Sequence, residues 1–254
     1  MHLRCEGLKT LAYALSSLVP RVGPWHTQRM AVAVEQQVAR KGRRLLVLGF
    51  WLWVALALLF VALSAFAAFY DYFPADERIA HEIQDIDVPA FGGFVDFVNT
   101  LGDAWLYVSL TLLAAIAFAT MRAGWASAAV LLTFAPRALN SVLKDLIERP
   151  RPSPELLDAS NDASGFGFPS GHTVGTAALF GVLFFLIPAA VPWRPLRWLL
   201  QLGCLLLVVA AGPARVYVGA HWPSDTLGGY LLALLFLAPL AVAYAAVARR
   251  PVDA

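Results

Sequence analysis

Two residues near the C-terminus, His221 and Asp225, have types and a spacing that suit acid–base or nucleophilic chemistry. They are four residues apart, so one helical turn places the Asp225 carboxylate against an imidazole nitrogen of His221. A carboxylate in that position fixes the imidazole tautomer and raises the basicity of the other ring nitrogen. A metal pair is the competing interpretation, but no third ligand lies nearby in the sequence.

A second polar segment, Pro169-Ser170-Gly171-His172, comes directly before a long apolar run. The N-terminus of a helix presents unpaired backbone N–H groups and a positive dipole end, and these features bind phosphate. Ser170 can donate a hydroxyl, and Gly171 lets a ligand approach the backbone closely. The plainer alternative is a serine N-cap followed by an interfacial histidine.

A third segment, residues 144–152, is basic and contains Lys144 followed by two Arg-Pro pairs. Arg137, Asn140 and Lys144 are spaced by three and four residues, so they share one face of a helix. That face must point into a bundle, because lipid offers these groups no partner. Lys144 alone could be a basic helix end that snorkels to the interface. The two Arg-Pro pairs beside it favour a binding site.

The elements that must position these residues are membrane helices. The chain has 254 residues and is 59% hydrophobic but only 14% charged, whereas a soluble domain carries about 25% charged residues. Six apolar runs approach or exceed the ~20 residues that cross the hydrocarbon core as a helix. They are Leu45 to Tyr70, Ala104 to Met121, Ala123 to Leu143, Thr173 to Trp193, Trp198 to Ala214 and Thr226 to Ala248. We therefore predict an all-α bundle of six transmembrane helices.

Basic residues set the predicted orientation of this bundle. They border the first span, two of the short connections and the C-terminus: Arg40, Lys41, Arg43, Arg44, Arg122, Arg194, Arg197, Arg249 and Arg250. The segment 71–103 instead holds eight acidic residues and one basic residue. The positive-inside rule then places both termini in the cytoplasm. The three polar segments consequently converge on the extracytoplasmic side.

Convergence of these groups has a chemical meaning. Fixed cations and N–H donors around an oxyanion are what phosphoryl transfer requires. Two histidines can supply the nucleophile and the acid of a covalent route.

The remaining segments complete the predicted organisation. Residues 1–44 are expected to be a cytoplasmic tail, residues 45–248 the membrane domain and residues 249–254 a second cytoplasmic tail. Between the first two spans, four apolar residues recur at three- and four-residue spacing: Phe91, Phe94, Val95 and Val98. This pattern predicts a short amphipathic helix on the membrane surface.

Three blocks of this sequence resemble the type 2 phosphatidic acid phosphatase superfamily, which also includes vanadium haloperoxidases and bacterial acid phosphatases. The first family block is Lys, six residues, Arg-Pro, and Lys144 with Arg151-Pro152 matches it. The second is Pro-Ser-Gly-His, which Pro169–His172 matches in full. The blocks appear in the family's order, and the resemblance covers roughly residues 45–248.

The third family block is Ser-Arg, five residues, His, three residues, Asp. Arg215, His221 and Asp225 match it, whereas Ala214 takes the place of the serine. A hydroxyl that only hydrogen-bonds a neighbour contributes about 1 kcal/mol. If the hydroxyl contacts the transition state, its loss costs more. Ala214 therefore concerns the rate more than the type of reaction.

The resemblance also implies roles for these residues. His221 would be the nucleophile that forms a phosphohistidine, Asp225 would orient it, and His172 would protonate the leaving group and then activate water. No metal or other cofactor is implied. The residues that would hold the phosphoryl oxygens are Lys144, Arg151, Ser170, Gly171 and Arg215.

A site at the outer end of a membrane bundle suits a lipid phosphate or diphosphate. By resemblance the candidates are undecaprenyl diphosphate, phosphatidylglycerophosphate and phosphatidic acid, and we rank the polyprenyl diphosphate slightly first. No nucleic-acid partner is expected.

Two other functions compete with a lipid phosphatase: a vanadate-dependent haloperoxidase, and a lipid- or phosphate-binding transporter without catalysis. Phosphate release from a lipid substrate would distinguish a phosphatase from both.

Overall fold

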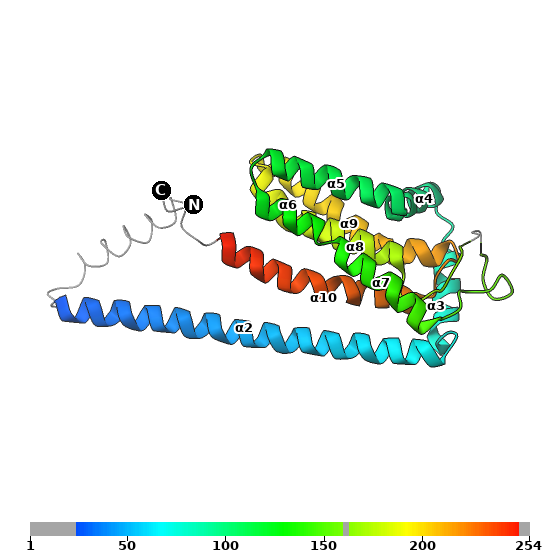
Figure 1. The fold of residues 1–254 in the computed structure, drawn as a ribbon, viewed down its shortest axis with the longest axis horizontal. Helices are drawn as coiled ribbons and strands as arrows, with labels where there is room; N and C mark the ends of the chain where they lie inside the picture. Colours follow the sequence, from blue (N-terminus) through cyan, green and yellow to red (C-terminus); the bar gives the residue numbers. More distant parts are fainter. Residues whose placement is uncertain (1–23, 160–162, 249–254) are drawn as a thin grey trace. The chain divides into compact units, whose positions relative to one another are not determined.

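The computed structural model describes residues 24–159 and 163–248. This part of the chain is helical and contains no strand, which confirms the all-α prediction (Figure 1). The chain divides into two compact units, Met1–Leu52 and Trp53–Ala254. In the first unit the described element is the N-terminal part of helix α2 (Pro24–Phe69), and the second unit contains the remainder of α2 and all later helices.

Helix α2 begins earlier than the first predicted span. Part of the segment predicted as a tail, from Pro24 to residue 44, is therefore helical. The stretch of α2 that is long and apolar enough to cross a membrane is Arg40–Phe69. Residues 1–23 and 249–254 lie outside the described residues, so the cytoplasmic tails stay predictions.

Five stretches of the described residues meet the length and composition of a membrane span. They are Arg40–Phe69, Gly124–Ile147, Gly171–Ala190, Arg194–Tyr217 and Pro223–Tyr244. A sixth results if α4 (Phe91–Gly102) and α5 (Ala104–Thr120), which are bent by 68° at their junction, count as one span. Five to six spans agree with the predicted bundle.

The third predicted span is made of two helices, α6 (Gly124–Leu131) and α7 (Phe134–Ile147). Pro136 lies in the first turn of α7, where a helix has no intrahelical partner for its N–H groups. The proline is therefore accommodated where one helix has ended and the next begins.

The segment between the first two predicted spans holds two helices where we predicted one. The first, α3 (Pro74–Gln84), begins with a proline, and the Asp76 carboxylate accepts the backbone N–H of the N-cap residue Phe73 at 2.9 Å. The second, α4, covers the predicted amphipathic pattern: Val95 and Val98 are buried, whereas Phe94 is exposed. Val95 and Val98 pack against Ala214, Val218 and Ala220.

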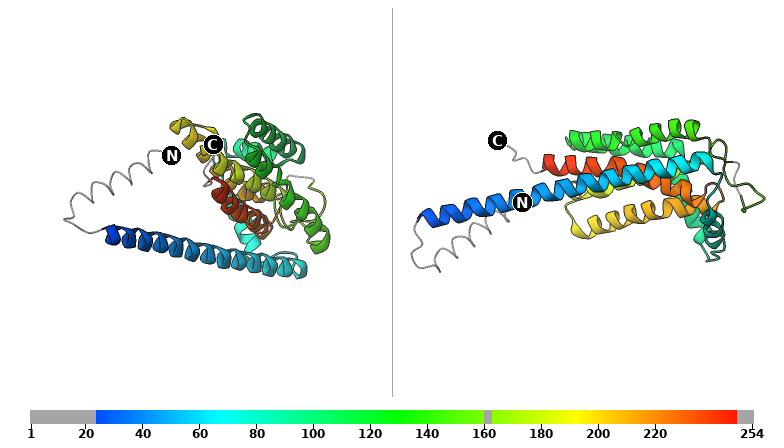
Figure 2. Two further views of the ribbon diagram at one scale, coloured as in Figure 1. Left: turned by 60° about the vertical axis from the view of Figure 1, so that its left-hand side comes forward. Right: turned by 90° about the horizontal axis from the view of Figure 1, so that it is seen from below.

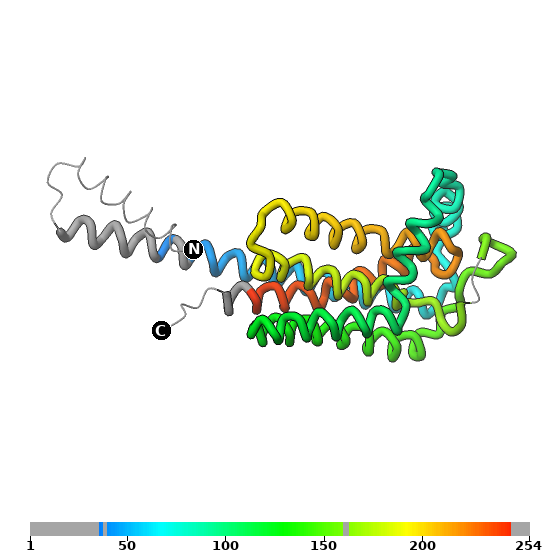
Figure 3. Tube along the Cα trace, turned by 90° about the horizontal axis from the view of Figure 1, so that it is seen from above, coloured from blue at the N-terminus to red at the C-terminus, as the bar shows by residue number. Residues whose placement is uncertain are grey.

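Helix α8 (Gly171–Ala190) is central in the second unit. It contacts α5, α6, α7, α9 (Arg194–Tyr217) and α10 (Pro223–Ala248), and Figure 2 shows the long helices of this unit running side by side. Its buried face is rich in small residues such as Thr173, Gly175, Thr176, Ala177 and Ala178. Small side chains let membrane helices approach closely. One end of the unit gathers α3, α4 and the connection between α7 and α8 (Figure 3).

Candidate active site

The three polar segments predicted from the sequence meet at this end of the bundle. The backbone N–H of Ser170 donates to the Asp225 carbonyl at 3.0 Å, and that of Gly167 donates to the Arg149 carbonyl at 2.7 Å. The Arg151 guanidinium donates to the Ala220 carbonyl at 2.7 Å. The start of α8, the α7–α8 connection and the start of α10 are thus joined into one framework.

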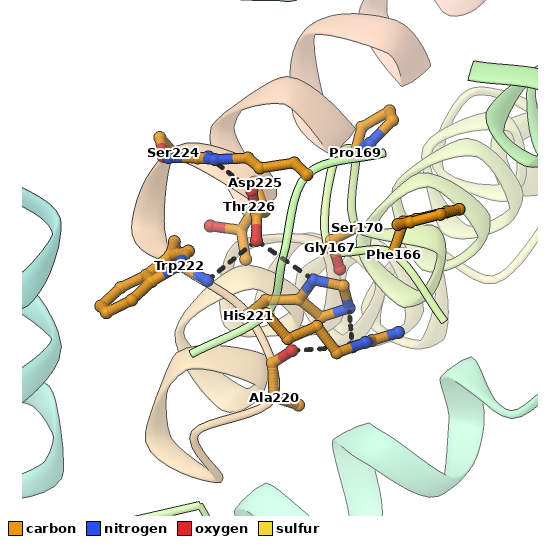
Figure 4. Close-up of polar contacts among 12 residues, drawn as sticks. Phe166, Gly167, Pro169, Ser170, Ala220, His221, Trp222, Ser224, Asp225 and Thr226 are labelled. Carbon is orange, nitrogen blue, oxygen red and sulfur yellow. Dashed lines mark hydrogen bonds and ion pairs between the residues drawn. The ribbon is translucent and has the colours of Figure 1, made fainter. Parts of the chain in front are cut away.

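His221 lies in the connection between α9 and α10 and is 2% exposed (Figure 4). Its Nε2 is 3.1 Å from Arg151 Nη1, and its Nδ1 is 3.5 Å from Asp225 Oδ2. Because a guanidinium can only donate, Nε2 is the acceptor and the imidazole proton is on Nδ1, toward Asp225. The Nδ1 contact is an ion-pair distance, and Nδ1 has no hydrogen-bond partner among the described residues. Contacts of this kind often shorten only in the complex with substrate.

Asp225 lies in the first turn of α10, and its two oxygens have different partners. Oδ1 accepts a hydrogen bond from Arg149 Nη1 at 2.6 Å. Oδ2 accepts the backbone N–H of Trp222 at 3.0 Å and faces His221. The carboxylate is fully buried, so these contacts determine its orientation.

The protonation of His221 follows from its surroundings. Burial holds the pKa of His221 well below its usual value, and the charges of Arg151 and Lys144 lower this pKa further. The neutral imidazole is the nucleophilic form. That form therefore persists at pH values at which an exposed histidine is already protonated.

His172 occupies the first turn of α8, on a different helix from His221. Its Nε2 is 3.1 Å from Oδ1 of Asp103, which lies between α4 and α5. A Cβ on Gly102 would lie 2.5 Å from the His172 ring, so only glycine permits this approach.

Lys144 and Arg151 are both held against the segment 164–167. Lys144 Nζ donates to the carbonyls of Phe166 and, at 3.3 Å, Gly167. Arg151 donates to the carbonyls of Gly165 at 2.9 Å and Ser164 at 3.1 Å. Arg151 also contacts His221 Nε2 at 3.1 Å, and a Cβ on Gly167 would lie 2.9 Å from Asp225 Oδ2, so both cations border the same site.

Ser170 and Gly171 form the N-terminus of α8. Ser170 is at the N-cap position, but its side chain makes no capping hydrogen bond. Its hydroxyl instead accepts a hydrogen bond from Thr173 at 3.1 Å. A Cβ on Gly171 would lie 2.9 Å from Asn140 Oδ1, so the backbone is close to α7 here. The plain serine cap considered from the sequence is therefore not what the structure contains.

Arg215 is buried in the last turn of α9. Its Nη1 donates to Asn99 Oδ1 on α4 at 3.2 Å, and its Nε has no hydrogen-bond partner among the described residues. Pro213 interrupts the α9 hydrogen bonds immediately before it. The Tyr230 hydroxyl replaces hydrogen bonds that the helix loses at Pro213. It accepts the Gly212 N–H at 2.7 Å and donates to the carbonyls of Val208 and Val209 in α9.

Ala214, the departure from the family pattern, lies in an apolar cluster with Val95 and Val98 of α4 and with Val218 and Ala220. Its methyl group therefore packs on the apolar side of α4. A serine here would direct its hydroxyl to the carbonyl one turn back in α9. We therefore expect the missing hydroxyl to affect packing against α4 more than the reaction.

We predict that Ala214→Ser changes kcat/KM by less than about threefold, because a hydroxyl bonded within its own helix contributes little net energy. Steady-state kinetics on the purified protein would measure this, with Ala220→Ser as a matched change in the same cluster. A tenfold or larger gain in Ala214→Ser alone would contradict the packing interpretation.

Several side chains that contact predicted site residues do not stand out individually in the sequence. Asp103 contacts His172, Asn99 contacts Arg215, and Arg149 contacts Asp225. Asp103 and Asn99 belong to the acidic segment 71–103, whose charge pattern indicates orientation and not a site. A glycine directly before Asp103 is the one local signal that could have marked it.

This arrangement can bind an oxyanion and transfer a group to nitrogen. Cationic side chains and a helix N-terminus surround a neutral, buried imidazole. Among the described residues, no three His, Cys, Asp or Glu side chains form a group that could hold a metal ion.

Comparisons with known proteins agree with the sequence resemblance. Residues 124–249 match the family model of the PAP2 superfamily. Phosphatidylglycerophosphatase B of Bacillus subtilis is 30% identical over 184 residues, which cover 72% of this chain and 89% of that protein. Undecaprenyl-diphosphatase of Sulfolobus acidocaldarius is 25% identical over 150 residues, 57% of this chain and 66% of that one. The crystal structure of a transmembrane PAP2 type phosphatidylglycerolphosphate phosphatase from Bacillus subtilis has a TM-score of 0.65 and 27% identity, covering 78% and 98% of the two chains.

Proposed function

The chain belongs to the PAP2 superfamily and is an integral membrane lipid phosphate phosphatase; from that premise we propose that it hydrolyses its substrate through a phosphohistidine on His221, without a metal, at the extracytoplasmic face. The observation that carries the proposal is the pairing of His221. Its Nδ1 faces Asp225 and its Nε2 faces the cation Arg151, so the lone pair of Nε2 points toward the place where an oxyanion would bind.

In the first step, Nε2 of His221 attacks phosphorus and the bond from phosphorus to the leaving oxygen breaks. His172 gives its proton to that oxygen, and Asp225 stabilises the imidazole that becomes cationic. Lys144, Arg151 and Arg215 turn from their protein acceptors to the phosphoryl oxygens, together with the Ser170 and Gly171 end of α8.

In the second step, water attacks phosphorus and the phosphorus–nitrogen bond breaks. His172, now neutral, takes a proton from the water and is ready for the next cycle. Inorganic phosphate leaves, and His221 returns to its starting form. For a diphosphate, the lipid monophosphate is the product of the first step.

The orientation rests on the distribution of charge. The segments that carry the site adjoin the acidic segment 71–103, while the basic residues outside the site, such as Arg44, Arg122 and Arg194, border the other ends of the spans. Labelling of single cysteines introduced at Asp87 and Arg194 would test it. We expect a membrane-impermeant reagent to modify the cysteine of Asp87→Cys in intact cells. Labelling of Arg194→Cys alone would reverse the orientation.

For the substrate we propose a lipid phosphate or diphosphate, with phosphatidylglycerophosphate, undecaprenyl diphosphate and phosphatidic acid as the candidates. Relatives that share the family are named for two different lipids among these. The test is phosphate release by the full chain in detergent, measured as kcat/KM for each lipid with and without a chelator. Hydrolysis that survives chelation supports the proposal, and activity that requires a divalent metal contradicts it.

The pH dependence gives a further prediction. Arg151 is the largest of the charges that lower the pKa of His221, after burial. In Arg151→Gln that pKa rises, so the protonated, inactive imidazole persists to a higher pH. We expect the acidic limb of the kcat/KM profile to move to higher pH in this variant, in addition to a general loss of activity.

The profile would be measured on the free-enzyme parameter kcat/KM, with Arg78→Gln, an exposed arginine on α3, as the control. An acidic limb that stays in place, or moves to lower pH, would contradict the proposed role of neutral His221.

A further inference from the structure

The arginine of the first Arg-Pro pair, Arg149, makes contacts that the proposed mechanism does not use. Its side chain is fully buried. Nε donates to the carbonyls of Tyr70 at 3.2 Å and Asp71 at 3.1 Å, and the guanidinium lies over the Phe73 ring at 4.6 Å from the ring centre. The segment between α2 and α3 therefore forms one wall of the Arg149 site.

The other two nitrogens of Arg149 face two buried carboxylates. Nη1 contacts Asp225 Oδ1 at 2.6 Å, and Nη2 contacts Asp76 Oδ2 at 3.1 Å. Nη1 also donates to the Ser224 hydroxyl at 2.8 Å. A guanidinium remains charged when buried and presents its donors in a fixed plane. Arg149 thus compensates both carboxylates and sets the angle between them.

Asp76 extends this network to the helix that carries Asp225. Its Oδ1 accepts the backbone N–H of Ser224, in the first turn of α10, at 2.9 Å. Its Oδ2 accepts the Ser224 hydroxyl at 2.6 Å and the Phe73 N–H at 2.9 Å. One carboxylate from α3 therefore satisfies N–H groups at the start of two helices. Rotation of Asp225 would have to break this set of contacts together.

We propose that Arg149 is a positioning residue for the reaction: with Asp76 it holds Asp225 Oδ1, so that Oδ2 remains turned toward Nδ1 of His221. The inference rests on the proposed function, since it concerns the same nucleophile. The two arginines of the Arg-Pro-Arg-Pro segment then serve opposite sides of one imidazole. Arg151 contacts Nε2, the attacking nitrogen of His221. Arg149 contacts the Asp225 carboxylate, which faces the other ring nitrogen, Nδ1.

The first test is Arg149→Lys, which keeps the charge but loses the planar set of donors. We expect kcat to fall about 100-fold, because a displacement of about 1 Å in a catalytic group has an effect of that size. KM and inhibition by inorganic phosphate, the product of the reaction, should change less than about threefold, because the groups that bind phosphate are unaltered. Arg78→Lys, on the exposed face of α3, is the matched control.

A double-mutant cycle separates positioning from general stability. If Arg149 acts through Asp225, adding Arg149→Lys to Asp225→Asn lowers kcat by less than about threefold further. Losses that multiply in full, or a rise in KM in place of a fall in kcat, would overturn the inference. If Arg149→Lys does not fold, Asp76→Asn takes its place, because an asparagine oxygen can still accept the Ser224 N–H. We expect about a tenfold fall in kcat for Asp76→Asn, with the same loss of additivity against Asp225→Asn.

His221→Ala is measured in the same series, so that the two proposals fail separately. Activity retained in His221→Ala would refute the proposed mechanism itself. An inactive His221→Ala together with a fully active Arg149→Lys would refute only the positioning role.

Discussion

Replacing His221 with alanine lowers phosphatase activity about 10⁴-fold or more, because it removes the nitrogen that we propose as the nucleophile. Removal of the nucleophile from other covalent hydrolases has effects of this size, and the activity that remains comes from binding alone. The cation cradle of Lys144, Arg151 and Arg215 is not altered by this change. We therefore expect kcat to fall while inorganic phosphate is still bound, which turnover and binding measurements would show on one preparation.

The control for this experiment is His81→Ala, which removes an exposed histidine on α3 outside the site. We expect the control to keep its kcat within about twofold, since surface changes away from a site have small effects. A His221→Ala protein with more than about a tenth of the normal kcat would mean that water attacks phosphorus directly.

The second large effect concerns His172 and depends on the leaving group. With a lipid alkoxide as leaving group, His172→Ala should lower kcat about 10²–10⁴-fold, because the departing oxygen needs a proton. A nitrophenyl phosphate monoester that carries an alkyl chain on its ring releases a weakly basic phenolate, which leaves without being protonated. Its first step should therefore be nearly normal in His172→Ala.

The second step still lacks its base in this variant, so the phosphoenzyme should accumulate. We predict a rapid burst of about one phenolate for each enzyme molecule, followed by slow turnover. Stopped-flow absorbance would measure the burst, with the unaltered protein as the comparison. Equal losses for both leaving groups, with no burst, would contradict the role of His172 as acid and base.

The membrane helices and the convergence of the three polar segments were predictable from the sequence because both depend on local patterns. The apolar runs have the length of a span, and the charge asymmetry places the polar segments at the same side. His221 and Asp225 are four residues apart, so their proximity is a local property. In the structure, His221 Nδ1 and Asp225 Oδ2 are 3.5 Å apart.

The contributions of α3 and α4 were not predictable in this way. Asp76, Asn99 and Asp103 reach Arg149, Arg215 and His172 across long distances in the sequence, and no spacing rule connects these pairs. Within an acidic segment, the sequence around each of these residues does not differ from the sequence around an exposed polar residue. Only the tertiary structure distinguishes a buried Asp76, which is 3% exposed, from Glu82 on the same helix, which is exposed.

Local breaks in the helices were also beyond the sequence patterns. No charged residue interrupts the sequence at Leu132 and Thr133. The pattern therefore predicts one span where the structure has two separate helices, α6 and α7. The 68° bend between α4 and α5 likewise falls at Asp103, whose carboxylate is directed to His172. At this position the helix boundary serves the candidate site.

The central proposal is that phosphorus becomes bonded to Nε2 of His221. Its most direct test is to react His172→Ala with the nitrophenyl substrate, quench in base, in which a phosphohistidine is stable, and locate the phosphoryl group by mass spectrometry of peptides. We predict one phosphoryl group per chain, on the peptide that contains His221 and absent when His221→Ala is added. A phosphoryl group on another residue, or a burst of phenolate without any phosphoenzyme, would contradict the proposal.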